Sequence, residues 1–533
     1  MRTQRSVAGP LARIAVMFGA VLILEGAALS EAAKPPAMRV IDPASIRHYF
    51  TEFYNDEREM LGAAPPIQWD WFVEDIPFLD VPDKNLEEIY YFRWYSFQKH
   101  IRKTPDGYII DEFLDDVPWA GKFNSINMAA EMHIREARWL RNSMYAKSDA
   151  SFWTGPDGEP RRYSLALADT VYQLYLSTGD KEFAIRLLPA LESNYESWEK
   201  AHLDPIGLFW QIDDRDGMED SIGGDGYRPT INSYMYADAV AISQIAKLAG
   251  DTQTAIKYEG KATGLRNLIE GLMWDPQANF YETVPRHAGS GWVKVRELIG
   301  YVPWYYNEAP VSHDIAWKQL FDPNGFAGRF GPTTAERRSP RFEFKFPHEC
   351  LWNGPSWPFA TTQTLVALAN VLNGPEQSFV SPSDYFRLFE TYTRSQHIRL
   401  ASGRVVPWID EDLDPDTGDW IARSILEARH QPPPNRGRYY NHSGFADLVI
   451  TGLIGLRPED NNTFTVHPLV PSGKWSYFAV DGVPYRGHLL TILYDRDGHR
   501  YGRGAGMLVL CDGKVVAHSP ALTSIRVTMP GRP

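Results

Sequence analysis

Residues 210–221 form an acidic loop whose composition suits proton transfer. The loop reads Trp-Gln-Ile-Asp-Asp-Arg-Asp-Gly-Met-Glu-Asp-Ser, so five carboxylates and one arginine follow an aromatic residue. Crowded carboxylates raise one another's pKa, and a carboxyl that keeps its proton near neutral pH suits general acid catalysis. Such a loop can also be solvated or bind calcium, but the alternating ligands and terminal Glu of an EF-hand are missing. We therefore predict a general acid here, either Glu219 or Asp220, and no metal ligand.

A second loop, residues 406–420, carries another carboxylate beside aromatic residues. Glu411 lies between Trp408 and Trp420 in the sequence, and the Asp-Pro-Asp-Thr-Gly run at 414–418 has turn chemistry. We expect this turn to hold Glu411 between the two indole rings, where loss of solvent and stacking suit a sugar site. Inverting hydrolysis of a glycosidic bond needs two such carboxyls, about 6.5–9.5 Å apart, one to protonate the leaving oxygen and one to activate water.

A third stretch, residues 351–358, reads Leu-Trp-Asn-Gly-Pro-Ser-Trp-Pro and precedes an apolar helix predicted over 359–372. Pro358 fits the first turn of that helix. The start of a helix does not account for Trp352 and Trp357, and we interpret these indoles as contacts for a sugar ring.

These three segments resemble glycoside hydrolase family 63 and its neighbours, including a bacterial mannosylglycerate-hydrolase-like branch and, more distantly, the inverting trehalases. The resemblance covers most of residues 60–460. In that family the acid is an Asp in a Gly-(aromatic or Met)-Asp motif, and Glu219 occupies its place after Gly217 and Met218. The base is a Glu before a Pro-x-Thr-Gly turn, which matches Glu411.

Two departures from the family pattern bear on the acid. Glu219 stands where the family has Asp, which moves the carboxyl by about one methylene, and Ile222-Gly223-Gly224 replaces the Pro-Arg that follows. Either the sugar subsite differs or Asp220 is the acid. The family's Trp-Arg-Gly-Pro-hydrophobic-Trp-Pro motif is similar to residues 352–358, with Asn353 in place of Arg.

The resemblance also implies contacts between the chain and its substrate. The residues that we expect to bind substrate are Trp119, Asp216, Arg228, Trp352, Asn353, Trp357, Trp408 and His442. His442 belongs to Tyr440-Asn441-His442-Ser443, which opens the last inner helix, so it either contacts sugar hydroxyls or satisfies a helix terminus.

Helices must position these loops, because apolar residues recur at helical spacing between about residue 40 and residue 460. After Asn232 they stand at 237, 240, 241, 245 and 248, and Gly250 supplies a left-handed cap. Gly179-Asp180 and Gly250-Asp251 each end one helix and cap the next. Repeated hairpins without a strict sequence period indicate a mainly α fold, a closed (α/α)6 toroid. Beyond residue 458, β-rich runs with Asp-Gly turns predict a small C-terminal module.

The 533 residues are long enough for more than one domain. We predict a signal peptide at 1–33, a toroid at 34–459 and a β-rich module at 460–533. Arginines precede the apolar stretch 14–24 and small residues follow it, as in a secretory signal, which predicts a periplasmic or secreted protein. An anchor that stays attached is the alternative, although the stretch is short for a membrane span.

Composition limits the partners. A net charge of -13 without a nucleic-acid motif argues against DNA or RNA, and no internal apolar run is long enough to suggest a membrane span. With only two cysteines, Cys350 and Cys511, a zinc cluster of cysteines is excluded and one bridge stays open. We expect a carbohydrate substrate and no cofactor.

The sequence therefore predicts an exo-acting, inverting glycoside hydrolase. Three alternatives remain at this point: a phosphorylase, a polysaccharide lyase, and a carbohydrate-binding protein without turnover. A phosphorylase does not need Glu411, and a lyase relies on Tyr, His or Arg chemistry. A binding protein has no need for two carboxylates in acid and base loops.

Overall fold

Glycine and aspartate divide the helices into hairpins, as predicted. Helix α6 (Leu167–Thr178) ends at Gly179 with φ of 68°, and the side chain of Asp180 caps α7 (Lys181–His202) by accepting from the amide of Phe183. Helix α8 (Pro229–Ala249) ends in the same way at Gly250, with φ of 76°, before α9 (Thr252–Met273). Glycine adopts this left-handed geometry without the clash that a Cβ brings.

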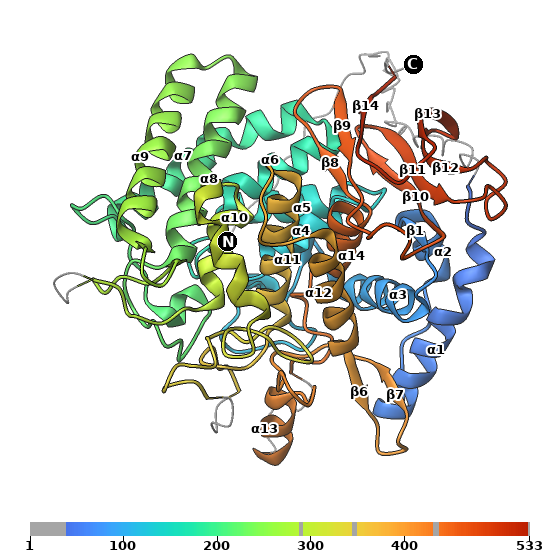
Figure 1. Cartoon of the computed structure of the whole chain (residues 1–533), viewed down its shortest axis with the longest axis horizontal. Coiled ribbons are helices and arrows are strands. Elements are labelled where there is room, and N and C mark those ends of the chain that lie inside the picture. Colours follow the sequence, from blue (N-terminus) through green and yellow to red (C-terminus); the bar gives the residue numbers. More distant parts are fainter. Residues whose placement is uncertain (1–38, 287–290, 344–348, 430–435, 531–533) are drawn as a thin grey trace, which may run out of the picture. The chain divides into compact units, whose positions relative to one another are not determined.

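The hairpins close into a ring in the computed structural model, which describes residues 39–286, 291–343, 349–429 and 436–530. The inner segments of the described chain are α4 (Ala130–Ala137), α6, α8, α10 (Val302–Tyr305), α11 (Pro358–Asn373), and α14 (Phe445–Asp447) with the π-helical turn η5 (Leu448–Leu453). Each contacts the next, and α14 returns to α4. This closed order confirms the (α/α)6 toroid (Figure 1).

Outer helices pack against these inner segments. The outer set comprises α3 (Lys84–Lys99), α5 (Met144–Thr154), α7, α9, η4 (Val311–Phe321) and α12 (Pro382–Ser395). Most side chains of α4, α8 and α11 are buried, as expected for helices surrounded by others. The remaining helices lie before the ring or in its loops: α1 (Pro43–Leu61), α2 (Trp69–Asp75), η1 (Lys122–Asn124), η2 (Asp213–Asp216), η3 (Leu298–Tyr301) and α13 (Ile421–Arg429).

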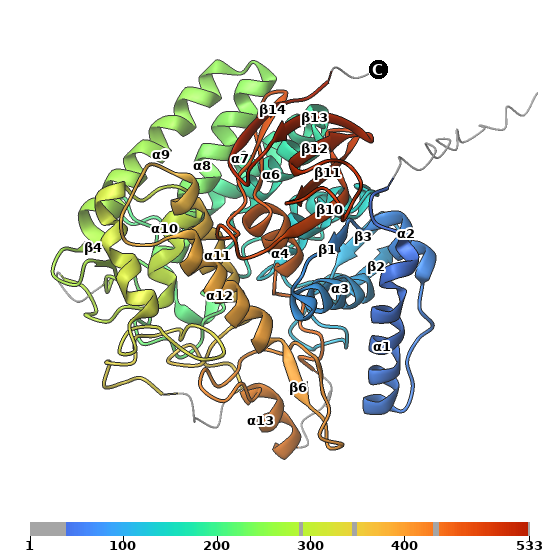
Figure 2. The ribbon, with the colours of Figure 1, turned by 45° about the vertical axis from the view of Figure 1, so that its right-hand side comes forward.

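A β-rich module follows the ring. Its antiparallel five-stranded sheet has the order β1 (Phe78–Asp80), β10 (Tyr477–Tyr485), β11 (His488–Asp495), β12 (Gly506–Cys511) and β13 (Lys514–Ser519). A second sheet has the order β14 (Ile525–Thr528), β9 (Thr463–Val466) and β8 (Leu456–Pro458). Strand β1 precedes the ring in the sequence, yet Phe78 pairs with Asp481 (Figure 2). The module therefore takes in residues from both sides of the boundary predicted at 459/460.

The described chain also contains three two-stranded antiparallel sheets. They are β2 (Ile101–Thr104) with β3 (Gly107–Ile110), β4 (Trp274–Asp275) with β5 (Phe280–Tyr281), and β6 (His397–Arg399) with β7 (Val405–Pro407).

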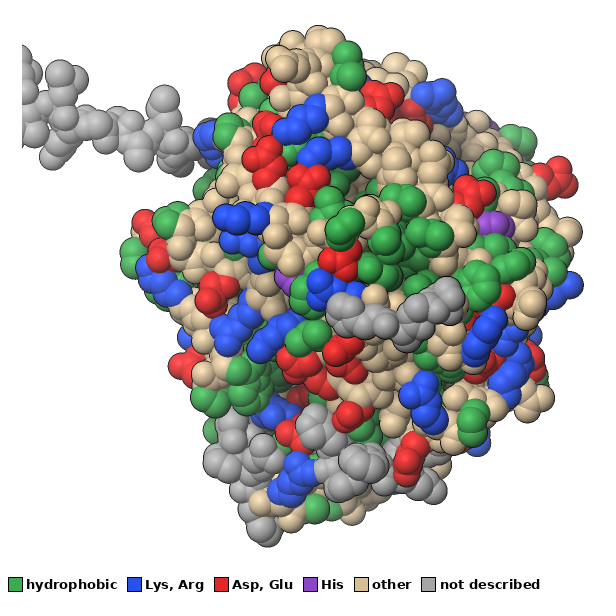
Figure 3. Space-filling view, turned by 90° about the vertical axis from the view of Figure 1, so that its left-hand side faces the viewer, with side chains coloured by type: hydrophobic (Ala, Val, Ile, Leu, Met, Phe, Trp, Pro, Cys, Tyr) green, Lys and Arg blue, Asp and Glu red, His purple; other side chains and the backbone are tan. Residues whose placement is uncertain are grey.

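Acidic and basic side chains are interspersed on the face that Figure 3 shows. Among the described helices, none combines the length and apolar character that a bilayer crossing demands. The predicted signal peptide, 1–33, lies outside the described residues.

Candidate active site

A cavity of about 240 Å³ lies where the inner helices begin. Its walls come from the segments that precede α4, α6, α8, α11 and α14. Its lining residues with polar or titratable side chains are Glu112, Trp119, Tyr163, Glu219, Glu349, Cys350, Trp352, Trp357, Glu411, Arg436, Tyr440 and His442. The volume is below the ~300–1,000 Å³ typical of sites for drug-sized ligands, so the cavity suits one small ligand.

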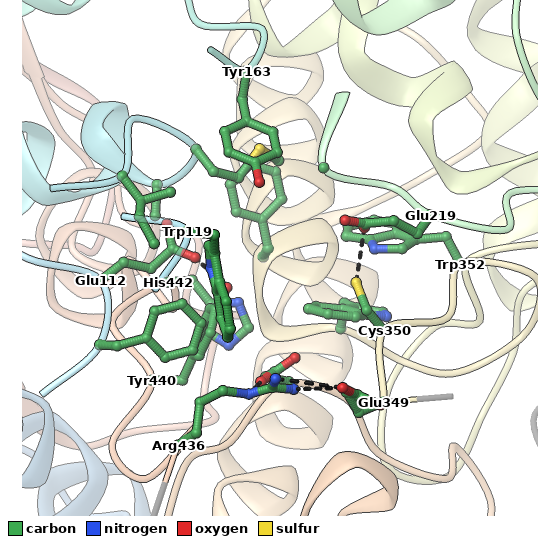
Figure 4. Close-up of a pocket in the computed structure, with 18 residues that line it drawn as sticks. Glu112, Trp119, Tyr163, Glu219, Glu349, Cys350, Trp352, Arg436, Tyr440 and His442 are labelled. Atoms are coloured by element: carbon green, nitrogen blue, oxygen red, sulfur yellow. Dashed lines mark hydrogen bonds and ion pairs between the residues drawn. The ribbon is translucent and has the colours of Figure 1, made fainter. Parts of the chain in front are cut away.

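Glu219 reaches this cavity from the loop before α8. Gly217, in left-handed conformation with φ of 67°, ends η2, and any Cβ there would meet the sulfur of Met128 at 2.4 Å. The carboxyl Oε2 of Glu219 accepts from the Cys350 thiol over 2.8 Å (Figure 4). Burial, then the charges of Glu219 and Glu411, raise the pKa of this thiol well above its usual value.

A buried ion pair anchors the Glu219 loop. Arg228, at the N-terminus of α8, donates through Nε to Asp216 Oδ2 over 2.6 Å, and both side chains are fully buried. The same guanidinium donates to the carbonyl of Gly224 and the hydroxyl of Ser221. Asp216 and Arg228 were expected to contact substrate. They instead neutralise each other outside the cavity wall, because two opposite charges without solvent need each other as partners.

Backbone hydrogen bonds join the three motif segments. The amide of Trp352 donates to the carbonyl of Glu219 over 3.1 Å. Ser356 and Leu413 exchange two bonds of 2.9 Å, which attach the Trp352 segment to the Glu411 loop. The two carboxylate loops are thus both hydrogen-bonded to the segment that contains Trp352 and Ser356.

Glu411 is buried in its loop between two further acidic residues. Asp410 pairs with Arg423 over 2.7 Å, and the amide of Ala422 donates to Asp412 over 3.0 Å. Burial raises the pKa of Glu411 to about 7; nearby carboxylates add to this, while Arg436 opposes it. The carboxyl is therefore poised to exchange a proton near neutral pH.

Arg436 links two carboxylates at the base of the cavity. Its Nε donates to Glu411 Oε1 over 3.1 Å, and its Nη1 lies 3.4 Å from Glu349 Oε1. Glu349 also pairs with Arg429 over 2.8 Å. Figure 4 shows the guanidinium directed toward Glu349, and the indole of Trp119 lies 5.2 Å from the guanidinium carbon.

Glu112 is a further carboxyl in the wall, on the side opposite Glu219 in Figure 4. The Tyr440 hydroxyl donates to its Oε1. Burial raises the pKa of Glu112 to about 8, and the charges of Glu411 and Glu219 add to this. This carboxyl therefore holds its proton at neutral pH.

The aromatic side chains of the wall are arranged in two groups. Trp352 and Trp357 stack with centroids 4.7 Å apart, and Trp119 stands edge-to-face against Phe113. His442 donates through Nε2 to the carbonyl of Asp410 over 3.0 Å. Burial lowers the pKa of His442 well below its usual value, so the ring is uncharged and its Nδ1 carries no proton.

Three other expected site residues lie outside the cavity wall. Asp220 is exposed in a left-handed conformation with φ of 59°, so the wall receives Glu219 and not its neighbour. Asn353 is half-buried beside the wall. Trp408 and Trp420 line a different hollow, where the indole of Trp420 donates to the carbonyl of His397. They do not enclose Glu411, because the Asp410–Arg423 pair lies against Trp408.

Sequence reasoning missed Glu112, Glu349 and Arg436. Glu349 stands three residues before the Trp352 motif, which is a signal that could have found it. Arg436 likewise stands four residues before Tyr440, in the segment that opens the last inner helix, whereas Glu112 lies in no recognised motif and only the folded ring brings it to the cavity. In the described chain, His488, Cys511 and Asp512 place possible metal-ligand atoms within 4.8 Å of one another, in the β-rich module and not in this wall.

Carboxyls on facing sides of a small aromatic cavity, at the mouth of an (α/α)6 ring, define a carbohydrate-active enzyme of the toroid type. Residues 122–443 match the family described as "Mannosylglycerate hydrolase MGH1-like glycoside hydrolase domain". The chain belongs to this family, and it is a glycosidase that acts on carbohydrate. Residues 456–518 match "Glycosyl hydrolase family 65, C-terminal domain", which covers most of the β-rich module.

Solved structures and a curated relative resemble the chain to different degrees. A structure described as "Sialidase" is 41% identical, with a TM-score of 0.85 over 91% of this chain and 45% of that one. The GH63 mannosylglycerate hydrolase of Thermus thermophilus, in complex with glucose, is 15% identical, with a TM-score of 0.50 over 68% of this chain and 99% of that one, and shows the fold alone. An uncharacterised protein of Borreliella burgdorferi is 26% identical over 151 residues, 28% of this chain and 31% of its own. The chain thus spans less than half the length of the "Sialidase" chain and of the Borreliella protein.

Proposed function

We propose that this chain is an exported, exo-acting glycosidase that inverts the anomeric centre, with Glu219 as general acid and Glu411 as general base. The carrying observation is that these two carboxyls, from loops far apart in the sequence, line one cavity. The volume of about 240 Å³ favours a single terminal sugar ring over the middle of a chain. Export rests on the signal-like N-terminal sequence.

The assignment of roles follows from the neighbours of each carboxyl. Arg436 donates to Glu411 and favours its ionised form, which a base needs in order to take a proton from water. Glu219 accepts from the uncharged thiol of Cys350. In the proposed reaction Glu219 gives its proton to the glycosidic oxygen as the bond to the anomeric carbon breaks. Water attacks that carbon from the opposite face, and its proton passes to Glu411.

A panel of aryl glycosides, followed by proton NMR of the first-formed sugar, tests both the activity and its stereochemistry. We expect the anomer opposite to that of the substrate. Formation of the same anomer would contradict inversion. The assay is run without phosphate, so that a dependence on added phosphate reveals a phosphorylase.

Leaving groups distinguish the acid from the base. The Glu219→Gln variant should hydrolyse alkyl glycosides about 10²–10⁴-fold more slowly than the unchanged protein. It should keep much of its rate on dinitrophenyl glycosides, because dinitrophenolate leaves without being protonated. The Glu411→Gln variant should lose both, because water still needs a base. If Glu219→Gln were equally impaired on both substrates, or if either variant kept full activity, the assignment would fail.

A sialidase is a second candidate, because the 41% identical structure is described by that word. The chain covers only 45% of that protein, so the activity named there is not assigned to the shared part. A 4-methylumbelliferyl sialoside in the same panel separates the two candidates: release of the fluorophore at a rate above those of neutral glycosides would favour the sialidase.

A further inference from the structure

Four carboxyl groups and one cation belong to the described wall of the active-site cavity. The described acidic and basic residues there are Glu112, Glu219, Glu349, Glu411 and Arg436. His442 adds no positive charge, because burial lowers its pKa. Glu112 lies on one side in Figure 4, Glu219 and Glu349 lie on the other, and Arg436 lies between the sides at the base.

The charge of Arg436 is already balanced. Its guanidinium contacts Glu411 at 3.1 Å and Glu349 at 3.4 Å, and Trp119 lies 5.2 Å from the guanidinium carbon. Only 8% of the Arg436 side chain is exposed. Glu349 is held from its other side by Arg429 at 2.8 Å, which fixes the carboxylate against Arg436. A ligand anion would therefore have to displace a carboxylate of the protein from this guanidinium.

Recognition of an anionic ligand in a closed site calls for a cation whose charge is not already satisfied. A ligand carboxylate at Arg436 would meet the negative charge of Glu349, and that of Glu411 when it is ionised, at short range, where solvent screens the repulsion poorly. Sugar hydroxyls meet no such repulsion, since carboxylates accept their hydrogen bonds and the indoles contact the faces of the ring.

We propose that the cavity selects an uncharged sugar ring and rejects an anionic one, and that Glu349 enforces this selection by occupying the guanidinium of Arg436. The proposal rests on the proposed function in one respect, the assignment of the cavity to a terminal sugar. Glu349 acts through Arg436 and takes no part in proton transfer, so it is a residue of specificity and not of catalysis.

Matched pairs of monosaccharides test the selection by binding alone. Glucose, galactose and mannose are titrated against glucuronate, galacturonate and mannuronate, with N-acetylneuraminate as a further acid, at pH 7 and fixed ionic strength. Tryptophan fluorescence reports occupancy, since three indoles line the cavity. For the sugar that binds, we expect its acid to bind at least ten-fold more weakly. An acid that binds as tightly as its neutral partner, or an acid that binds alone, would overturn the proposal.

Variants of Glu349 test whether this residue causes the preference for neutral sugars. Glu349→Gln keeps the shape of the side chain and removes its charge. We expect it to reduce the affinity gap, the ratio of the Kd of the acid to the Kd of its neutral sugar, at least five-fold. Glu349→Asp keeps the charge and should preserve most of the gap, as should Asp106→Asn, an exposed acid in the turn between β2 and β3. An unchanged gap in Glu349→Gln would refute the role of Glu349. If that variant does not fold, Arg436→Gln serves instead: the gap should widen, and a narrowed gap would count against the proposal.

These outcomes are separable from the fate of the proposed function. Neutral sugars that bind without any glycoside being hydrolysed would refute the catalytic assignment and leave the charge selection intact. Hydrolysis of neutral glycosides together with tight binding of uronates would do the reverse.

Discussion

The amide of Trp352 donates to the carbonyl of Glu219 over 3.1 Å, and through it the proposed acid is fixed to the segment that also holds the proposed base. Four residues further along, Ser356 pairs with Leu413 within the Glu411 loop. Both carboxylate loops are therefore hydrogen-bonded through their backbones to the same segment, residues 352–358. The Trp-x-Gly-Pro-x-Trp-Pro segment thus lies between the two carboxylate loops in space as well as in sequence.

The acid limb of the pH–rate profile should report Glu411. Its pKa of about 7 means that kcat/KM rises as pH increases through about 7, because the base works only when ionised. Arg436→Gln removes the cation that stabilises the carboxylate, so the limb should move to higher pH. Glu349→Gln removes a like charge, so the limb should move to lower pH. Profiles of kcat/KM against pH for the three proteins check this, and shifts in the same direction for both variants would contradict it.

The Cys350 thiol should orient the carboxyl of Glu219. Cys350→Ala removes its hydrogen bond, and we expect kcat to fall about 2–10-fold with little change in KM, the rate equivalent of about 0.5–1.5 kcal/mol. Cys350→Ser keeps a donor at the same position and should restore most of the rate. An equal loss in both variants would indicate packing and not the hydrogen bond.

Alkylation tests the state of the same thiol. Its raised pKa leaves it protonated at neutral pH, so iodoacetamide should modify Cys350 slowly at pH 7 and faster as pH rises. A bound sugar should slow the reaction, because Cys350 lines the cavity. Mass spectrometry of the peptides measures this, with the buried Cys511 as an internal comparison. Rapid modification at pH 7 would show that the thiol is ionised.

The helical framework could be predicted from local sequence, and the two carboxylate loops from their resemblance to a known family. Gly250 and Asp251 indicate where one helix ends and the next begins, because a left-handed cap and an aspartate N-cap are local requirements. Pro358 opens α11 for the same kind of reason. Glu219 and Glu411 stood out because each lies in a motif that a known family shares.

The rest of the wall depends on contacts that sequence does not display. Arg228 was expected to bind substrate because the sequence alone does not distinguish an arginine that binds a ligand from one in a buried ion pair. Only the fold shows that Asp216 lies 2.6 Å from it. Glu112 reaches the cavity because the β2–β3 ladder ends beside it, far in sequence from Tyr440, the partner of its carboxyl. Long-range pairing of this kind needs the closed ring.

The buried pair of Asp216 and Arg228 should be essential to the Glu219 loop. Asp216→Ala leaves a guanidinium buried without its carboxylate, and we expect a loss of about 3–5 kcal/mol in the free energy of unfolding together with reduced kcat. Asp214→Ala is a control in the same loop: its pair with Arg215 is half-exposed and should be worth less than about 1 kcal/mol. Urea unfolding compares the variants. The double variant Asp216→Leu with Arg228→Met should recover much of the stability but not the rate, and a stable, fully active Asp216→Ala protein would contradict the anchoring role.

Glu112 should make the folded chain less stable as pH rises. Its pKa is 4.5 in ordinary surroundings and about 8 in the fold, so between these values the unfolded chain ionises while the folded chain must keep the proton. The free energy of unfolding therefore decreases progressively from about pH 4.5 to pH 8, by up to about 5 kcal/mol. Above that range Glu112 causes no further decrease. Glu112→Gln has no proton to lose, and its amide oxygen can still accept from Tyr440. Its Tm relative to the unchanged protein should rise between pH 5 and pH 8, whereas Asp106→Asn should show no such trend. A difference in Tm that stays constant across this range would mean that Glu112 is ionised in the fold, and the cavity would then carry one more negative charge at neutral pH.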